Sequence, residues 1–322
     1  MNSKQKSILK ITIPILLSIV AIWYSFSIIP IENLISSFRQ ADYAFVLLGA
    51  FMGLLSHLSR AYRWRFQLEP MGYKIKLGNS VMAVFAAYLI NYTIPRAGEV
   101  ARASVLTNYE GIPFEKSFGT IVSERIADMV VMLGIIIVTL FLQFDFIFEK
   151  LSDSISIYKI IITAVLAVII ILILTRTIQK GNSKIILKIK SFVNGLLEGV
   201  CSIFKMKKKW LFIFHTLFIW SMYVLMFYAT SFSIAETSDI PFAAILVGFI
   251  FASFSIAATN GGIGSYPLAI YAAFSVFNVP EDPSIAFGWI MWTSQTLMIM
   301  FFGGISLLYL PLYNRKTSKT NF

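Results

Sequence analysis

The feature that most limits the fold of this chain is the recurrence of apolar runs close in length to a helix that crosses a lipid bilayer. Eight such segments occur in the 322 residues, at about 11–30, 43–59, 77–95, 117–142, 158–175, 210–234, 240–277 and 284–311. A spanning helix needs ~20 apolar residues, whereas a barrel strand needs ~10 residues of alternating pattern. Helices and closed barrels are the only backbones that satisfy their hydrogen bonds in lipid, so the sequence predicts an all-α polytopic membrane protein.

The composition supports this class and argues against several others. Only 13% of the residues are charged, about half of the ~25% found in soluble domains. One cysteine excludes an internal disulfide, and two histidines give little basis for a metal site, so no metal and no other cofactor is expected. The run 11–30 is too long for a signal peptide and lacks a small-residue cleavage site, which favours a retained anchor. In a membrane chain the net charge of +11 does not indicate nucleic acid, and its distribution reports topology instead.

Lys and Arg predict which connections face the cytoplasm. They concentrate before residue 11, in 60–76, in 176–209 and after residue 311. Acids dominate the other connections, where Arg39 and Lys150 are the only basic residues: 31–42, 143–157, 235–240 and 278–283. We expect the first group inside and the second outside, with both termini cytoplasmic, in the inner membrane of a prokaryote. The connection 176–209 is also amphipathic, as in a helix on an anionic membrane surface or in a plain cytosolic hairpin.

These charges agree with the apolar segments only if two segments enter the membrane, break and return. Residues 77–107 would enter from the cytoplasm, and residues 240–277 from outside. The chain would then be a single transmembrane domain, 1–322, with about six crossings and two re-entrant hairpins, followed by a short cytoplasmic tail. Its halves, about 1–142 and 158–311, would form an inverted repeat, an arrangement typical of transporters that bind substrate at the breaks. Eight plain transmembrane helices are the alternative.

The first break, NYTIPRAGEVAR, carries the strongest functional signal. Pro95 ends one helix, and free amides at the start of the next would attract an anion. Arg96 and Arg102 add charge suited to phosphate oxygens, and Glu99, three residues from each, can pair with either. An ordinary charged turn would explain these charges but not Asn91 and Pro95 at the end of an apolar run.

The segment 117–142 contains SERIADMVV, three ionisable groups in an apolar run. Glu124 and Asp128 share one helical face, and Arg125 can reach Asp128. Such groups usually face a bundle interior or an aqueous cavity. We therefore expect them to pair with the arginines of the first break or to respond to protons. If the helix begins near residue 127 instead, these charges lie among the headgroups.

The second break, TNGGIGSYP, offers Asn260, Gly261, Gly262, Gly264 and Ser265. Glycines allow a backbone to approach a ligand closely and to direct amides toward it. No Lys-Ser/Thr and no strand accompany them, so this is not a nucleotide loop. Helix breaking for tight packing is an equal alternative on composition alone.

A third motif, RAYRWRF, places Arg60, Arg63 and Trp64 at the cytoplasmic end of the segment 43–59. Arg and Trp at such a position usually anchor a helix to lipid headgroups. Loading of a substrate headgroup is the second interpretation of this motif.

Taken together, RAYRWRF, IPRAGEVARASVL, SERIADMVV and NGGIGSYPLAIY resemble the transmembrane region of lysylphosphatidylglycerol synthases, a family also called flippase-like. In larger relatives this region moves an aminoacylated anionic phospholipid that a separate cytosolic domain makes. The resemblance covers nearly the whole chain and implies roles for the matching positions: Arg63, Trp64, Asn91, Pro95, Arg96, Gly98, Glu99, Arg102, Glu124, Arg125, Asp128, Gly261, Gly262 and Gly264. Asn260 and Pro267 stand where the family often has a proline and an acid, so a carboxylate role there is not implied.

The sequence thus predicts a lipid translocator that moves an anionic phospholipid or lipid-linked substrate through an arginine-lined headgroup site. Pro95, Gly98 and Pro267 are expected to break the helices. No aminoacyl-transfer domain fits in the connections, so no enzymatic activity is expected. A membrane-embedded transferase acting on a lipid and a non-transporting envelope scaffold are the alternatives. Further copies of the chain or an envelope-biosynthesis enzyme are expected as partners, and nucleic acid is not.

Overall fold

The computed structural model describes residues 16, 18–94, 96–143 and 206–315, and every regular element in these ranges is a helix. This result confirms the predicted all-α membrane class. Four helices are long and apolar enough to cross a membrane, and the bent pair Ser18–Ile28 and Ile31–Gln40 could provide a fifth span. The chain divides into two compact units, one of Met1–Val122 with Lys207–Phe322 and one of Ser123–Met206.

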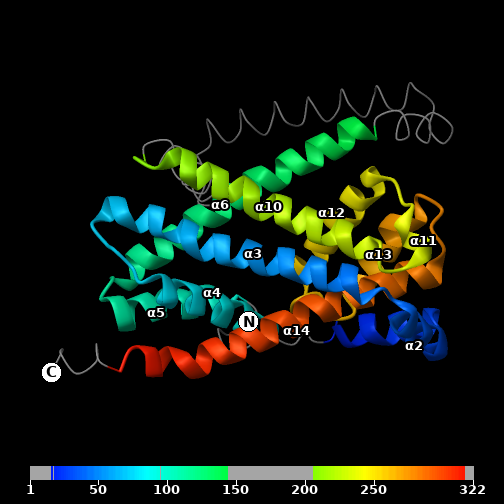
Figure 1. Cartoon of the computed structure of the whole chain (residues 1–322), viewed down its shortest axis with the longest axis horizontal. Helices are drawn as coiled ribbons and strands as arrows, with labels where there is room; N and C mark the ends of the chain where they lie inside the picture. The colour runs from blue at the N-terminus through cyan, green and yellow to red at the C-terminus, as the bar shows by residue number, and fades with distance from the viewer. Residues whose placement is uncertain (1–15, 17, 95, 144–205, 316–322) are drawn as a thin grey trace, which may run out of the picture. The chain divides into compact units, whose positions relative to one another are not determined.

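The first unit contains most of the described helices (Figure 1). They are α2 (Ile31–Gln40), α3 (Tyr43–Leu68), the 3-10 turn η1 (Glu69–Met71), α4 (Leu77–Thr93), α5 (Ala97–Glu110), α10 (Lys209–Ser231), α11 (Ala235–Ser238), α12 (Phe242–Ala258), α13 (Ser265–Ser275) and α14 (Glu281–Tyr313). The helix α6 (Phe114–Leu142) begins in the first unit and continues into the second.

Polar contacts join helix ends at one end of the first unit. The Lys208 ammonium before α10 lies 2.8 Å from the Glu69 carboxylate that follows α3. Asn79, near the start of α4, donates to Glu110 at the end of α5 (2.6 Å) and to Asn314 after α14 (3.0 Å). Among the described residues, this end therefore holds the basic connection 60–76, the end of 176–209 and the start of the C-terminal tail, all predicted to be cytoplasmic.

A second set of contacts defines the opposite end. The backbone amide of Asp42, before α3, donates to the carbonyl of Ser233, after α10 (2.9 Å). The Asn33 side chain on α2 donates to Asp282 at the start of α14 (2.8 Å). The acidic connections 31–42, 235–240 and 278–283 thus meet here, at the ends of α3, α10 and α14 that point away from the basic end, whereas 143–157 lies almost wholly outside the described residues.

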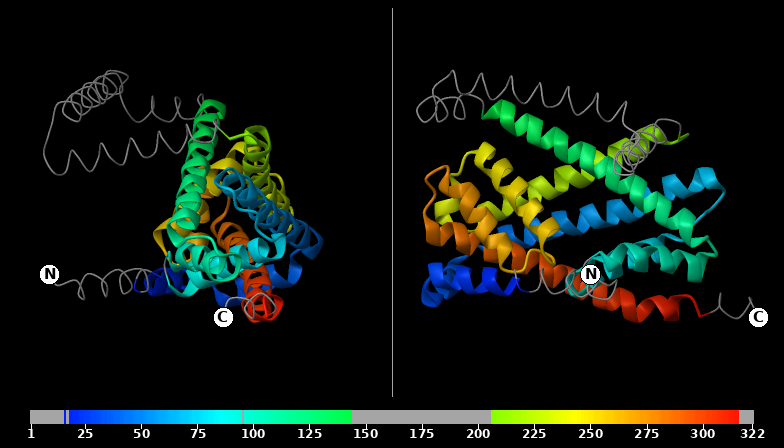
Figure 2. Two further views of the ribbon diagram at one scale, coloured as in Figure 1. Left: turned by 90° about the vertical axis from the view of Figure 1, so that its left-hand side faces the viewer. Right: turned by 180° about the vertical axis from the view of Figure 1, so that it is seen from behind.

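The helices α4 and α5 form a hairpin that returns to the basic end. Glu110 closes it by also accepting the Lys76 backbone amide (3.0 Å), so the last turn of α5 lies beside the first turn of α4. Near the break, a Cβ added to Gly98 would collide with the Ala87 carbonyl oxygen of α4. The two helices lie side by side in every view (Figure 1, Figure 2). The predicted break and return of the first hairpin is therefore present, and α5 ends at Glu110 rather than at residue 107.

The helices α12 and α13 form a second hairpin, which returns to the acidic end. The Ser255 and Ser265 hydroxyls, either side of the break, lie 2.7 Å apart. Closer to the acidic end, a Cβ on Gly248 would lie 2.7 Å from the Phe274 ring. The symmetry between the halves stays a prediction, because the segment 158–175, which would open the second half, lies outside the described residues. So does most of the amphipathic connection 176–209.

The tips of the two hairpins meet beside α14. A Cβ on Gly261 would lie 2.7 Å from the ring of Tyr92, which is in the last turn of α4. Thr296 of α14 donates to the Tyr92 hydroxyl (3.2 Å), and the Trp292 indole donates to the Gly261 carbonyl (2.8 Å). The α4–α5 and α12–α13 hairpins start at opposite ends of the unit, and their tips thus meet between those ends.

The connection 31–42, to which the sequence analysis assigned no helix, is largely helical. It forms α2, bent by 85° from the preceding helix Ser18–Ile28. Pro30 has no backbone N–H to donate and its fixed φ suits the start of a new helix, which places the bend there. The ten residues of α2 are too few to span a bilayer, so no apolar run of spanning length marks them in the sequence.

Candidate functional site

A row of polar side chains on α3 faces the interior of the first unit. Ser56, His57, Arg60, Arg63 and Gln67 follow one another at spacings of one to four residues, and each is at most 5% exposed. Residues three or four apart share one face of a helix, as do His57, Arg60, Arg63 and Gln67. Neighbouring helices bury Arg60, Arg63 and Trp64, which suits a polar interior better than an exposed anchor, and their contact with lipid headgroups stays a prediction.

Arg63 contacts α10. Its side chain is 0% exposed, and its Nη1 donates to the Thr216 hydroxyl at 2.7 Å. The guanidinium carbon lies 5.0 Å from the centroid of the Phe212 ring. A buried hydroxyl and an aromatic face together replace part of the water that a guanidinium loses on burial.

Arg102 of α5 lies over Trp64 of α3. Its guanidinium carbon is 3.8 Å from the ring centroid, and the two side chains are 4% and 0% exposed. The Trp64 indole N–H donates to the Thr120 hydroxyl at 2.7 Å, which fixes the plane of the ring. Cation–π pairs contribute most when they are desolvated, about 2 kcal/mol or more. The pair therefore links α5 to α3 through a charge held away from solvent.

The two arginines of the first break have different environments. Arg96 is exposed and adopts a left-handed conformation (φ 61°) just before α5, whereas Arg102 is buried. The start of α5 also has fewer free amides than predicted. Gly98 donates its N–H to the Asn91 side chain (2.8 Å), and Ala97 donates to Ile94 (3.2 Å). Asn91 thus caps the helix where the sequence predicted a residue that binds substrate.

Two residues predicted to break helices lie inside helices. Gly98 is the second residue of α5, and its missing side chain permits the close contact with α4. Pro267 is the third residue of α13, where a residue has no intrahelical partner for its N–H, so proline loses no hydrogen bond there. It packs closely on α14, because a Cβ added to Gly288 would lie 2.5 Å from the Pro267 Cα. Pro95 lies outside the described residues.

The second break is made by glycines in left-handed conformations. Gly261, Gly262 and Gly264 have φ values of 65°, 78° and 70°. The Ser265 hydroxyl contacts the hydroxyl of Thr259 at 2.9 Å as well as that of Ser255. Asn260 is 6% exposed, and its side-chain oxygen has no hydrogen-bond partner among the described residues. Such an oxygen is suited to accept a bond from a ligand or water.

The acidic motif lies within a continuous helix. The helix α6 begins at Phe114, which excludes the alternative in which it starts near residue 127. Glu124 and Asp128 are 1% and 5% exposed, whereas Arg125 is exposed and its Nη1 lies 3.8 Å from the Asp128 carboxylate. These residues belong to the second unit. Their pairing with Arg96 or Arg102 of the first unit stays a prediction.

Four interior residues were missed by the sequence reasoning: His57, Gln67, Tyr92 and Thr216. Neither atom of the Gln67 amide has a hydrogen-bond partner among the described residues, although the side chain is 3% exposed. The His57 ring lies 4.5 Å from that of Tyr88. The spacing of polar residues from Ser56 to Gln67 could have revealed this face. Within the described ranges, no group of three or more His, Cys, Asp and Glu side chains could hold a metal ion.

These features define a multi-pass α-helical membrane protein with two broken hairpins and an interior face that carries buried arginines. Residues 11–304 match the family described as the lysylphosphatidylglycerol synthase TM region, and the chain belongs to this family. It is 26% identical over 313 residues to the UPF0104 membrane protein MJ1595 of Methanocaldococcus jannaschii, covering 87% of this chain and 88% of that protein. It is also 30% identical over 122 residues to the glycosyltransferase AglD of Haloferax volcanii, covering 38% of this chain and 20% of that protein.

Proposed function

We propose that the protein moves an anionic phospholipid or a lipid-linked substrate across the cytoplasmic membrane of a prokaryote, with both termini cytoplasmic and without an enzymatic step. The headgroup passes along the polar face of α3, where α5 and α10 contact it, while the acyl chains stay in the bilayer. The observation that carries this proposal is the burial of Arg60, Arg63 and Arg102 in one unit of an apolar protein. Charges within membrane proteins are costly and usually mark a substrate path.

The chemistry of the arginines matches the proposed substrate. A guanidinium binds a phosphate through two parallel hydrogen bonds, which are stronger than bonds between neutral groups. The nearby Gln67 amide provides one donor group and one acceptor for the polar part of a headgroup. Trp64 contacts the face of the Arg102 guanidinium, which keeps this charge beside the polar face of α3.

The hairpins provide the means of movement. Irregular backbone within a membrane protein is tolerated where it is buried in protein or lines a cavity, and in transporters such breaks accompany alternating access. Tyr92 and Gly261 join the two tips, and Arg102 lies on the return helix of the first hairpin. A shift of α5 along α4 would therefore move Arg102 relative to Trp64.

A membrane-embedded transferase acting on a lipid substrate is the second candidate. One finding favours it, the partial similarity to a protein named a glycosyltransferase. That finding also favours a lipid-linked sugar as one substrate to be tested for translocation.

The proposal is tested with purified protein in proteoliposomes that contain a fluorescent phosphatidylglycerol or a fluorescent lipid-linked sugar. A membrane-impermeant quencher then reports how fast the inner-leaflet label becomes accessible. We expect the wild type to accelerate exchange over empty vesicles and Arg102→Gln to remove most of the acceleration. Arg102→Lys, which keeps the charge but loses the bidentate geometry, should retain part of it.

The matched control is Arg315→Gln, an exposed arginine at the basic end. It should exchange lipid at the wild-type rate, and size-exclusion profiles should show that all variants are folded. Equal rates for wild type and empty vesicles with both lipids would refute translocation. A new lipid product in the vesicles, lost in Arg102→Gln, would favour the transferase.

A further inference from the structure

The helix α2 has the features of a helix that lies along a membrane surface. It is bent by 85° from the helix Ser18–Ile28, so it runs across the direction of that helix. Ile31, Leu34, Ile35 and Phe38 follow the i, i+3, i+4, i+7 spacing of a single apolar face. Leu34 is buried, but Ile31 and Ile35 are 47% and 46% exposed. An apolar face that remains uncovered at the end of a membrane protein is suited to contact acyl chains.

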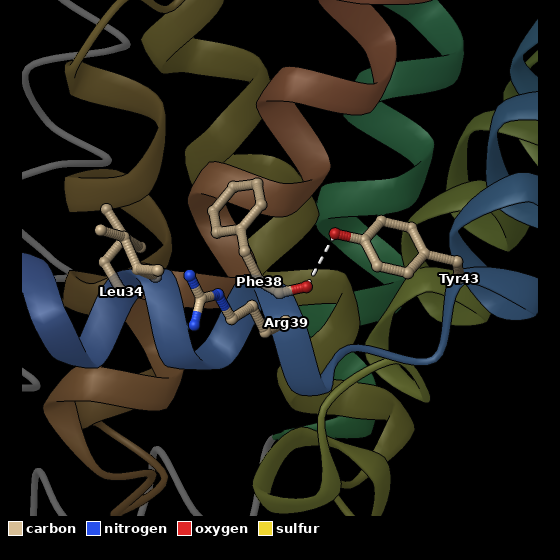
Figure 3. A pocket seen from close by; sticks show the side chains of 5 residues that line it. Leu34, Phe38, Arg39 and Tyr43 are labelled. Carbon is tan, nitrogen blue, oxygen red and sulfur yellow. Dashed lines mark hydrogen bonds between the residues drawn. The ribbon is translucent and has the colours of Figure 1, made fainter.

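A pocket of about 360 Å³ lies beside α2 (Figure 3). Leu34, Ile35, Phe38, Arg39 and Tyr43 line it, and its walls are almost entirely apolar. The Tyr43 hydroxyl donates to the Phe38 carbonyl at 2.7 Å, which fixes the corner between α2 and α3. The apolar lining is suited to hydrocarbon rather than to a polar ligand. The pocket could therefore hold part of an acyl chain.

The charges at this end of the protein restrict the headgroup. Arg39 is exposed and is the basic residue of this end within the described ranges, where it makes no ion pair. The acids of the same end are Glu32, Asp42, Glu236, Asp239, Glu281 and Asp282. A purely anionic headgroup would meet a single cation among these acids. A headgroup that carries an ammonium group besides its phosphate is complementary to both signs of charge.

We propose that this pocket binds a phospholipid with an ammonium-bearing headgroup at the acidic end of the protein. Arg39 binds the phosphate, the neighbouring acids attract the ammonium, and one acyl chain lies against Leu34, Ile35 and Phe38. The site is separate from the buried arginines of α3 and does not depend on the translocation proposal. It would attach the corner between α2 and α3 to the adjacent leaflet.

The experiment measures lipid retention rather than transport. The protein is reconstituted in nanodiscs that contain equal amounts of phosphatidylethanolamine and phosphatidylglycerol, released gently, and examined by native mass spectrometry. The wild type should retain phosphatidylethanolamine in preference to phosphatidylglycerol. Arg39→Gln removes a charge-assisted hydrogen bond and should lower that retention about tenfold. Ile35→Trp places a larger side chain in the pocket and should lower it without changing any charge.

Arg315→Gln is the control, because it removes an exposed arginine from the opposite end. Its lipid retention should equal that of the wild type. Equal retention of phosphatidylethanolamine by Arg39→Gln and the wild type would overturn the proposal, and so would a wild-type preference for phosphatidylglycerol. Because retention is read without any transport step, a negative transport assay leaves the result intact.

Discussion

Replacing Gly98 by alanine tests whether the first hairpin is closed as the structure has it. Gly98 lies in the first turn of α5 and faces α4. An added Cβ would collide with the Ala87 carbonyl oxygen and lie 2.8 Å from the Asn91 side-chain oxygen. A backbone carbonyl cannot rotate away as a flexible side chain can, so α5 has to move off α4. That movement also lengthens the hydrogen bond from Gly98 to Asn91, which is 2.8 Å long.

Three effects set the size of the change in stability. Alanine is favoured over glycine inside a helix by about 1 kcal/mol. Overpacking a close contact costs about 1–3 kcal/mol, and losing the hydrogen bond costs about 1 kcal/mol. The net destabilisation is about 2 kcal/mol, or roughly a thirtyfold fall in the ratio of folded to unfolded protein.

The assay is thermal unfolding in detergent, followed by tryptophan fluorescence. Gly119→Ala is the matched control, because Gly119 also lies in a helix of the first unit and a Cβ there would meet no atom within 4 Å. We expect Gly119→Ala to unfold at or above the wild-type temperature and Gly98→Ala several degrees below it. If both variants are equally stable, α5 does not pack on α4 in this register and the reasoning is refuted.

Three further predictions concern the site and the topology. Thr216→Val removes the hydroxyl that accepts a hydrogen bond from buried Arg63, and should lower the free energy of unfolding by about 1.5–3 kcal/mol in the same thermal assay. Arg96 has a left-handed conformation, which costs about 1–2 kcal/mol for a residue other than glycine. Glycine avoids this cost but loses about 0.5–1 kcal/mol through the greater freedom of the unfolded chain. Arg96→Gly should therefore be slightly more stable than the wild type. Single cysteines at Asn108 and Glu236, in a cysteine-free background, should react with an impermeant thiol reagent from opposite sides of the membrane.

Each of these predictions has a control or an outcome that would contradict it. Thr107→Val removes the hydroxyl of an exposed residue, which only donates to the Ala103 carbonyl of its own helix, and should change stability little, so equal effects at Thr107 and Thr216 would argue against the Arg63 contact. Asn278→Gly changes the other non-glycine residue with a positive φ among the described residues and should also stabilise, so a loss of stability in both variants would contradict the reasoning. Labelling of Asn108→Cys and Glu236→Cys from one side would be incompatible with hairpins that return to opposite ends.

The hairpins could be predicted from sequence because their causes are local or additive. Pro95 and the glycines from Gly261 to Gly264 restrict or release backbone angles wherever they occur. The charge of each connection is a sum over neighbouring residues, which is why the sequence separated the basic end from the acidic end. The helix α2 could not be predicted in this way, because its ten amphipathic residues form neither an apolar run long enough to span a membrane nor a turn signal.

The interior face of α3 could not be predicted because its burial depends on distant parts of the chain. RAYRWRF at the end of an apolar segment has the composition of an interfacial anchor. This end of α3 is buried only because two other helices pack on it. Arg102 of α5 lies over Trp64, and Thr216 of α10 accepts a hydrogen bond from Arg63. Asn91 was assigned to the substrate for a similar reason, since its hydrogen bond to Gly98 exists only once the chain has reversed direction.

The first hairpin connects the tip contacts to Arg102 through a single helix, α5. The return helix α5 is held to α4 near the break by Asn91 and at its far end by Glu110. Arg102 lies between these two attachments, so its position over Trp64 is fixed by both. A change at either attachment must therefore displace the guanidinium, and this should alter lipid exchange even where no substrate contact has been removed. Glu110→Gln, which keeps the size of the side chain but weakens the attachment at the basic end, should slow lipid exchange while the protein stays folded.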